Sequence, residues 1–141
     1  MSQHNQAAPA VGSMKKMFCR WLCLLLLSGF AMAARAAPPP AETQTDVMHL
    51  LKFVQESDCQ FNRNNTWHSG KDARPHLEMK YDYLAKRGAV KKAEDFIEKG
   101  ASESSFSGKP YQIRCADGKI IPNAQWLSEE LRRYRTGNAK K

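Results

Sequence analysis

Two short segments, residues 59–63 (CQFNR) and 111–115 (YQIRC), constrain the fold of this chain most. Each alternates apolar with polar side chains, a period typical of a β-strand that buries one face. If the two strands run antiparallel with their cysteines opposite each other, Phe61 lies opposite Ile113 on one face, and the other face is wholly polar. A slip of one residue would destroy this sorting. The segments therefore predict a small antiparallel sheet with a defined register.

The same register places Cys59 opposite Cys115, within the distance at which a disulfide forms. These are the only cysteines after residue 36, since Cys19 and Cys23 lie in the leader discussed below. The predicted bridge closes a loop of about 57 residues, which in the chain-entropy description stabilises the domain by roughly 4 kcal/mol. No set of Cys and His residues has the short spacing of a metal site, and we expect neither a metal nor a cofactor.

The first 36 residues have the three-part pattern of a secretory signal peptide. A basic stretch over residues 15–20 precedes the apolar run of residues 21–30, and small residues follow up to the triplet Ala34-Arg35-Ala36. The apolar run has half of the roughly 20 residues that a membrane-spanning helix needs. No cysteine stands at its end, where a lipid could be attached. We therefore predict cleavage near Ala36 and a periplasmic or secreted protein without a stable membrane anchor.

The leader accounts for half of the formal charge of the chain. The whole sequence has 22 Lys and Arg residues against 14 Asp and Glu residues, a net charge of +8. Four of the basic residues precede the predicted cleavage point and all acidic residues follow it, which leaves 18 basic residues against 14 acidic ones and a net charge of +4. Because nucleic-acid binding needs a concentrated basic face, this small excess does not predict a nucleic acid as partner.

The prediction divides the chain into four parts. They are a signal peptide over residues 1–36, a flexible lead-in over 37–44, a single globular domain over 45–135 and a basic tail over 136–141. Two alternatives stay open for the first part. Translation starts at Met1 or instead at Met14 or Met17, and residues 31–33 offer a second cleavage site.

Apolar residues at helical spacing and turn residues between them predict four helices and four strands in the domain. The helices span about residues 45–57, 72–86, 90–102 and 123–135, and the strands about 59–63, 66–68, 111–115 and 120–121. Asn64 and Asn65 suit a two-residue hairpin turn, Thr43 or Thr45 caps the first helix, and Pro75 fits the first turn of the second. The predicted fold is α+β, a small antiparallel sheet of three to four strands with about four helices packed on one face and one disulfide.

Four motifs of the domain recur in the same order in a known family. They are F-x-R-N at residues 61–64, H-L-x-x-K-Y at 76–81, A-E-x-F-I at 93–97 and S-S-x-S-G-K-P-Y at 104–111. Through these motifs, the chain resembles over residues 45–135 the YfeK-like family of small exported bacterial proteins, whose function is unknown. The resemblance implies export in a Gram-negative bacterium and supplies no activity, substrate or catalytic residue. The chain departs from the family at Asn65, where Gly is common, and at Lys92, where a Ser or Thr that caps the third helix is common.

Seven side chains near the predicted hairpin tip and the 104–110 loop form our candidate binding surface. They are Arg63, Asn64, His76, Lys80, Ser107, Lys109 and Tyr111. Arg63 lies opposite Tyr111 in the predicted register, where it either contacts a ligand or stacks on the tyrosine and holds the sheet. We expect a non-catalytic binding or interaction module whose partner is an unknown envelope protein or an anionic or glycan ligand.

The alternative hypothesis is a small envelope hydrolase, or an inhibitor of one, that uses His76 and a serine of residues 104–107. A serine nucleophile needs a base within hydrogen-bond reach and a third group that orients the base, and the sequence has no nucleophile-elbow motif. Residues 105–109 have the composition of an anion-binding loop but lack the first glycine of a P-loop, which favours a loop that ends a helix. We therefore assign no catalytic residue and interpret His76 as a partly buried structural histidine.

Overall fold

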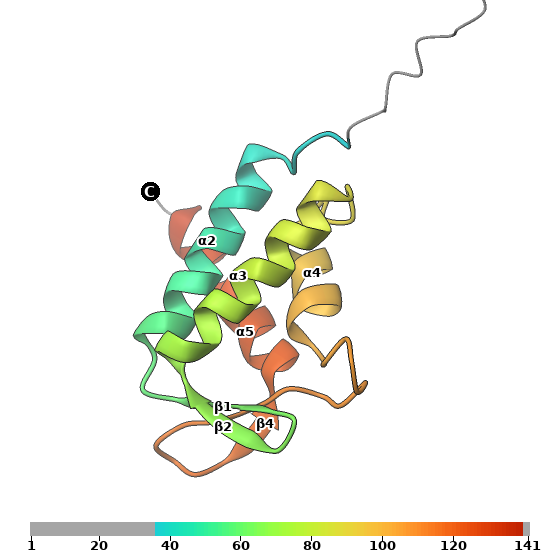
Figure 1. Ribbon diagram of the computed structural model, residues 1–141. Helices are drawn as coiled ribbons and strands as arrows, with labels where there is room; N and C mark the ends of the chain where they lie inside the picture. The colour runs from blue at the N-terminus through green and yellow to red at the C-terminus, as the bar shows by residue number, and fades with distance from the viewer. Residues whose placement is uncertain (1–35, 140–141) are drawn as a thin grey trace, which may run out of the picture. The chain divides into compact units, whose positions relative to one another are not determined.

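Helices rise from one side of a four-stranded antiparallel sheet in the part of the chain that the computed structural model describes, residues 36–139 (Figure 1). The elements are α2 (Ala41–Glu56), β1 (Gln60–Arg63), β2 (Thr66–Ser69), α3 (Gly70–Lys86), α4 (Ala93–Phe96), the π-helix η2 (Ile97–Ala101), β3 (Gln112–Arg114), β4 (Ile120–Pro122) and α5 (Asn123–Asn138). The strands lie in the order β2-β1-β3-β4. The predicted α+β class is confirmed, while the predicted leader, apart from Ala36, lies outside the described residues.

The predicted register between β1 and β3 is confirmed. The antiparallel pairs are Gln60 with Arg114, Phe61 with Ile113 and Asn62 with Gln112. Phe61 and Ile113 are buried in the core, and the polar pairs on either side of them face away from it. Next to this ladder, a disulfide joins Cys59 to Cys115, whose Cα atoms are 4.2 Å apart. The bridge therefore links the strand that follows α2 to the strand that precedes the C-terminal part of the domain.

The hairpin between β1 and β2 has the predicted two-residue turn. Asn64 and Asn65 both have a positive φ, 52° and 68°, as a type I′ turn requires. The backbone N–H of Asn65 donates to Asn62 Oδ1 over 3.1 Å and steadies the turn. Because the turn is two residues long, His68 lies opposite Phe61 on the inner side of the sheet. This position of His68 brings an imidazole to the edge of the core.

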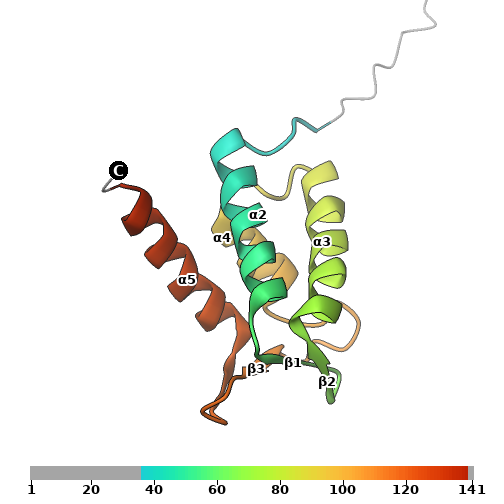
Figure 2. The same cartoon turned by 90° about the vertical axis from the view of Figure 1, so that its left-hand side faces the viewer.

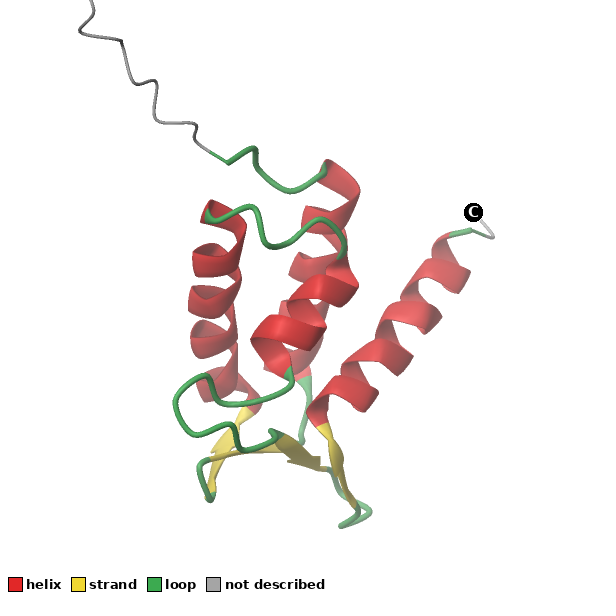
Figure 3. Ribbon diagram, turned by 90° about the vertical axis from the view of Figure 1, so that its right-hand side faces the viewer, coloured by secondary structure: helices red, strands yellow, loops and turns green. Residues whose placement is uncertain are grey.

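One apolar core lies between the sheet and the helices above it. Figures 2 and 3 show α2, α3 and α5 rising from the same side of the sheet, with the strands at their lower ends. The largest fully buried side chains are Phe96, Leu50, Leu51, Ile113, Leu127, Val47, Val54 and Val90 together with the polar Asn123. None of the helices within residues 36–139 is both long and apolar enough to cross a membrane.

A glycine allows α3 to start directly against the end of α2. A Cβ atom on Gly70 would lie 2.0 Å from the carbonyl oxygen of Val54, far inside any van der Waals contact. The helix begins at Gly70, two residues before the predicted start, with the Ser69 hydroxyl accepting from the backbone N–H of Asp72. Pro75 therefore lies in the second turn of α3 and not in the first, so the prediction for its place was wrong and the helix lacks one N–H donor there.

Two further helix starts differ from the predicted ones. Helix α2 begins at Ala41 after Pro40, and Thr43 does not cap it, because its hydroxyl donates to the carbonyl of Lys91. Helix α4 begins at Ala93 and not at residue 90. The Asp95 carboxylate accepts from the backbone N–H groups of Lys91 and Lys92 just before the helix. Lys92 makes no side-chain cap hydrogen bond to the first turn, so the half of a capping box that a Ser or Thr at position 92 would supply is absent and the half from Asp95 is present.

Helix α5 is held to the rest of the domain by an arginine near its end. The Arg135 guanidinium donates to the buried carboxylate of Asp46 on α2 over 2.7 Å and to Glu94 on α4 over 2.6 Å. The hydrogen bond from Arg135 lowers the pKa of Glu94. Since the helix runs to Asn138, it extends three residues past the predicted end at residue 135.

Candidate functional site

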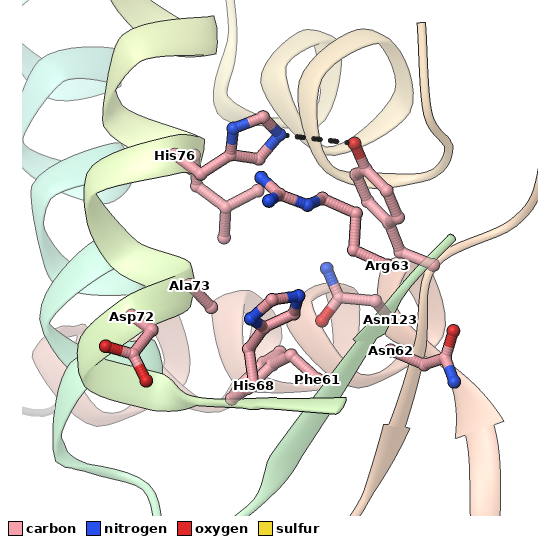
Figure 4. Close-up of a pocket in the computed structure, with 10 residues that line it drawn as sticks. Phe61, Asn62, Arg63, His68, Asp72, Ala73, His76 and Asn123 are labelled. Atoms are coloured by element: carbon pink, nitrogen blue, oxygen red, sulfur yellow. Dashed lines mark hydrogen bonds between the residues drawn. The ribbon is translucent and has the colours of Figure 1, made fainter. Parts of the chain in front are cut away.

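A small pocket lies where the hairpin β1–β2, the first turns of α3 and the start of α5 meet. It measures about 40 Å³, and Phe61, Ala73 and Leu77 form its apolar lining. Figure 4 shows the polar side chains that surround it, with Arg63, His68, His76 and Asn123 directed inward. The pocket is thus an apolar hollow with a few convergent polar groups, which is the usual form of a ligand site.

A larger groove of about 310 Å³ adjoins this pocket on the side of the 103–110 loop. Arg63, His76 and Tyr111 line both hollows and so stand between them. Lys80 and Phe106 add to the rim of the groove, and the Phe106 side chain is 98% exposed. A ligand that enters the inner pocket therefore has an outer surface to lie on.

Arg63 carries a positive charge that none of the described side chains neutralises. Among residues 36–139 its guanidinium makes no ion pair and no side-chain hydrogen bond, and it is half-buried between His76 and His68 (Figure 4). The acid that lines the same pocket, Asp72, points away from the centre in Figure 4 and accepts from the Ser69 hydroxyl over 2.6 Å. Because a half-buried charge is costly without a partner, the arrangement suits a negatively charged group from outside.

His76 and Tyr111 contact each other above Arg63. His76 Nε2 lies 3.4 Å from Tyr111 Oη (Figure 4), and which of the two donates depends on the tautomer of the imidazole. Burial above all, and then the positive charges of Arg63 and Lys80, lower the pKa of His76 from its ordinary 6.5. Burial raises the pKa of Tyr111. At neutral pH the pair is therefore an uncharged imidazole beside a protonated phenol.

Lys80 is fixed at the rim of the groove. Its Nζ donates to the carbonyl of Glu103 over 2.8 Å and lies 5.0 Å from the centre of the Tyr111 ring, within the range of a cation–π contact. Burial lowers the pKa of Lys80, and the nearby charge of Glu103 acts in the opposite direction. The rim of the groove therefore carries a positioned cation next to the one in the pocket.

The 103–110 loop is tied to the hairpin tip. The Ser107 hydroxyl donates to Asn64 Oδ1 over 2.7 Å, and Gly108, with a φ of 65°, turns the loop back so that its N–H donates to the carbonyl of Ser104. Lys109 is exposed and lines neither of the two hollows. Of the seven residues of the candidate surface, five line the pocket or the groove, and Ser107 is hydrogen-bonded to one of them, Asn64. The side chain of Lys109 lies apart from both hollows.

The serines of the loop are not placed as nucleophiles for His76. Within residues 36–139, the hydrogen bond of the imidazole is to Tyr111, and no serine hydroxyl bonds to it. The buried Ser104 hydroxyl instead accepts from the backbone N–H of Ser107 over 3.3 Å. A nucleophile, its base and a group that orients the base are the minimum for such catalysis, and the described residues do not assemble that set here.

Two residues of the pocket, His68 and Asn123, were missed from the sequence. His68 had a signal, because a two-residue turn at positions 64 and 65 places it opposite Phe61 on the inner face. Asn123 had none beyond the tendency of asparagine to begin helices. In the structure it is 2% exposed, its backbone N–H donates to the carbonyl of Tyr111, and its Nδ2 donates to the carbonyl of Ala101 over 2.9 Å.

The fold and the pocket define a small disulfide-bonded α+β domain with a concave site whose arginine has no acidic partner among the described residues. A model of a family of unknown function, DUF5329, matches residues 41–135, and the chain belongs to this family. The chain is 36% identical over 98 residues to the uncharacterized protein YfeK of Salmonella typhimurium strain LT2, a match that covers 70% of this chain and 77% of that protein. No solved structure matches significantly.

Proposed function

We propose that this protein is an exported, non-catalytic binding module whose pocket receives an acidic group of an envelope ligand. The observation that carries the proposal is the half-buried Arg63 guanidinium, which has no acid or other side-chain partner among residues 36–139 and lies in a concave site with two imidazoles. An arginine can hold a carboxylate or a phosphate through two parallel hydrogen bonds. Lys80 at the rim adds long-range attraction for the same kind of ligand.

Export is part of the proposal, and two independent features support it. The first 36 residues have the pattern of a cleaved leader, and a disulfide such as Cys59–Cys115 is typical of oxidising compartments. Fractionation of the native host followed by intact-mass measurement tests this. We expect a protein in the periplasm or medium that starts near Ala37 and has no free thiol. A cytosolic protein with an intact leader and reduced cysteines would overturn export.

Acid binding is tested on the purified domain by NMR titration with sodium acetate and, separately, with inorganic phosphate. We expect millimolar binding that shifts the signals of Arg63, His68 and His76. Arg63→Gln removes the charge and keeps a polar side chain, and it should weaken binding tenfold or more, since a charge-assisted hydrogen bond is lost.

Arg132→Gln is the matched control for this experiment. Arg132 is exposed on α5, its side chain makes no hydrogen bond or ion pair with any residue between 36 and 139, and its loss changes the net charge equally. The control should bind acetate or phosphate like the unaltered protein. If both variants lose the same affinity, or if neither anion shifts the signals of the pocket, the proposed function is wrong.

A further inference from the structure

The pocket contains a buried hydrogen-bond acceptor that no group in the described part of the chain satisfies. Asn123 Oδ1 is fully buried and has no donor among residues 36–139. Figure 4 shows the Asn123 side chain directed into the pocket, beside Arg63 and His68. A buried polar atom without a partner is costly, and such atoms are rare in folded proteins. This acceptor is therefore a second feature of the pocket, besides the charge of Arg63, that favours the binding of a ligand, in this case one with a hydrogen-bond donor.

The orientation of the Asn123 amide follows from its other contacts. Its Nδ2 donates to the carbonyl of Ala101 over 2.9 Å, and a reversed amide would place two acceptor oxygens against each other. The backbone N–H of the same residue donates to Tyr111, so the residue is held at two points. The pocket thus presents a held acceptor, Asn123 Oδ1, beside a group of donors, the guanidinium of Arg63.

We propose that the ligand is a carboxylic acid with an N–H or O–H group on the carbon next to the carboxylate. The carboxylate binds Arg63, and the neighbouring N–H or O–H donates to Asn123 Oδ1. This inference rests on the proposed function and narrows it, because acetate binds through its carboxylate alone and has no hydrogen to donate to Asn123.

The size of the pocket sets how close the two ligand groups must be. A water molecule needs about 10–15 Å³ of such volume, so a pocket of about 40 Å³ holds a group of three or four heavy atoms. A carboxylate and the carbon next to it are already four heavy atoms, which leaves no room for a longer spacer between the carboxylate and the donor. The donor must therefore belong to that carbon, and the remainder of the ligand lies in the outer groove of about 310 Å³, near Met79 and Phe106.

Two pairs of small acids test the inference on the intact domain by NMR titration or calorimetry. N-acetylglycine is compared with N-acetylsarcosine, which has a methyl group in place of the N–H hydrogen, and glycolate is compared with methoxyacetate, which lacks the O–H. We expect the donor-bearing member of at least one pair to bind tenfold or more tightly, the order expected when a buried acceptor is left without a partner. Preference within the first pair indicates a peptide terminus, and preference within the second indicates a hydroxy acid such as a sugar acid.

Asn123→Ala removes the acceptor and should abolish the preference within each pair, while Arg63→Gln should weaken all four acids. Because the alanine variant also loses the hydrogen bond to Ala101, circular dichroism must first show that it folds. If it does not fold, the ligand pairs still decide the question on the unaltered protein. Equal binding within both pairs, with acetate binding still dependent on Arg63, would overturn this inference and leave the proposed function standing. Absence of binding by all these acids and by acetate would overturn this inference, and if inorganic phosphate also failed to bind, the proposed function would fall with it.

Discussion

Removal of the disulfide offers the most direct test of how this domain is stabilised. The perturbation is the double substitution Cys59→Ala and Cys115→Ala, which replaces two half-buried sulfurs that pack against the core. The two cysteines are 56 residues apart in the sequence. For a loop of that length, the chain-entropy treatment assigns the bridge about 4 kcal/mol of stabilisation, through the restriction of the unfolded chain.

This magnitude is large for a domain of about 100 residues. Net stabilities of such domains are about 5–15 kcal/mol, so loss of the bridge removes between roughly a quarter and most of the free energy of unfolding. With a urea m-value of about 1–3 kcal/mol/M, the midpoint of unfolding should fall by at least about 1 M. The m-value itself should rise, because the unfolded chain without its cross-link exposes more surface.

Urea denaturation followed by the fluorescence of Trp67 and Trp126 measures both quantities. The unaltered protein kept in a reducing agent is the control, and it should reproduce the curve of the double variant, since both lack the cross-link. A loss of less than about 1 kcal/mol in both samples would refute the entropic reasoning. It would mean that the pairing of β1 with β3 and the core between them already hold the two halves of the domain together.

Three further outcomes follow from the structure. Gly70→Ala should destabilise the domain by about 3 kcal/mol or more, because its Cβ would lie 2.0 Å from the Val54 carbonyl oxygen. Gly137→Ala has open space around it and should be neutral or stabilise the domain by up to about 1 kcal/mol. Similar urea midpoints for the two variants would contradict the close approach at Gly70. Folding lowers the pKa of His76, so the unfolded chain takes up a proton at a higher pH than the folded protein does. The stability that the neutral imidazole contributes is therefore present above pH 6.5 and is lost as the pH falls below it. The free energy of unfolding measured from pH 7 to 5 should fall less steeply in His76→Gln, and an unchanged slope would exclude this contribution of His76. Phe106→Ser should change the thermal stability by no more than about 0.5 kcal/mol, because the side chain is 98% exposed, and a larger loss would show that the ring packs on the domain.

The sheet could be predicted because its determinants are local in the sequence. Alternation in the segments around Phe61 and Ile113, with a cysteine at the end of each, leaves one register that buries the apolar side chains. The turn at Asn64 and Asn65 could be predicted as well, since few residue types adopt a positive φ at two successive positions. Both predictions rest on neighbouring residues and a period of two, which tertiary packing did not override.

The starts of the helices could not be predicted, because they depend on contacts between distant segments. The sequence around Gly70 does not show that a glycine is needed there, yet the carbonyl of Val54 occupies the space of a side chain. The start of α4 depends on the Asp95 carboxylate, which bonds back to the two N–H groups before the helix. Lys92 supplies no side-chain cap, as its departure from Ser or Thr indicates, but that position alone does not show that Asp95 holds the N–H groups before the helix.

The charged residues of the pocket could be predicted from the sequence, whereas the buried acceptor, Asn123 Oδ1, could not. Arg63, His76 and Tyr111 were chosen from the hairpin register and a family motif, and the structure brings them together. The state of Asn123 depends on which carbonyl its amide nitrogen reaches, that of Ala101 more than twenty positions earlier. Only the packing of η2 against the start of α5 decides that the amide nitrogen of Asn123 has a hydrogen-bond partner and that its oxygen has none among the described residues.

The start of α2 and the end of α5 both lie at the end of the domain remote from the sheet (Figure 1). The pocket lies at the opposite end, where the hairpin meets the first turns of α3 and α5. A biotin or a fluorescent reporter attached after Asn138 would therefore leave the pocket open to solution. The domain is suited to immobilisation on a biosensor surface by its C-terminus, so that libraries of acids and envelope extracts can be passed directly over an accessible site.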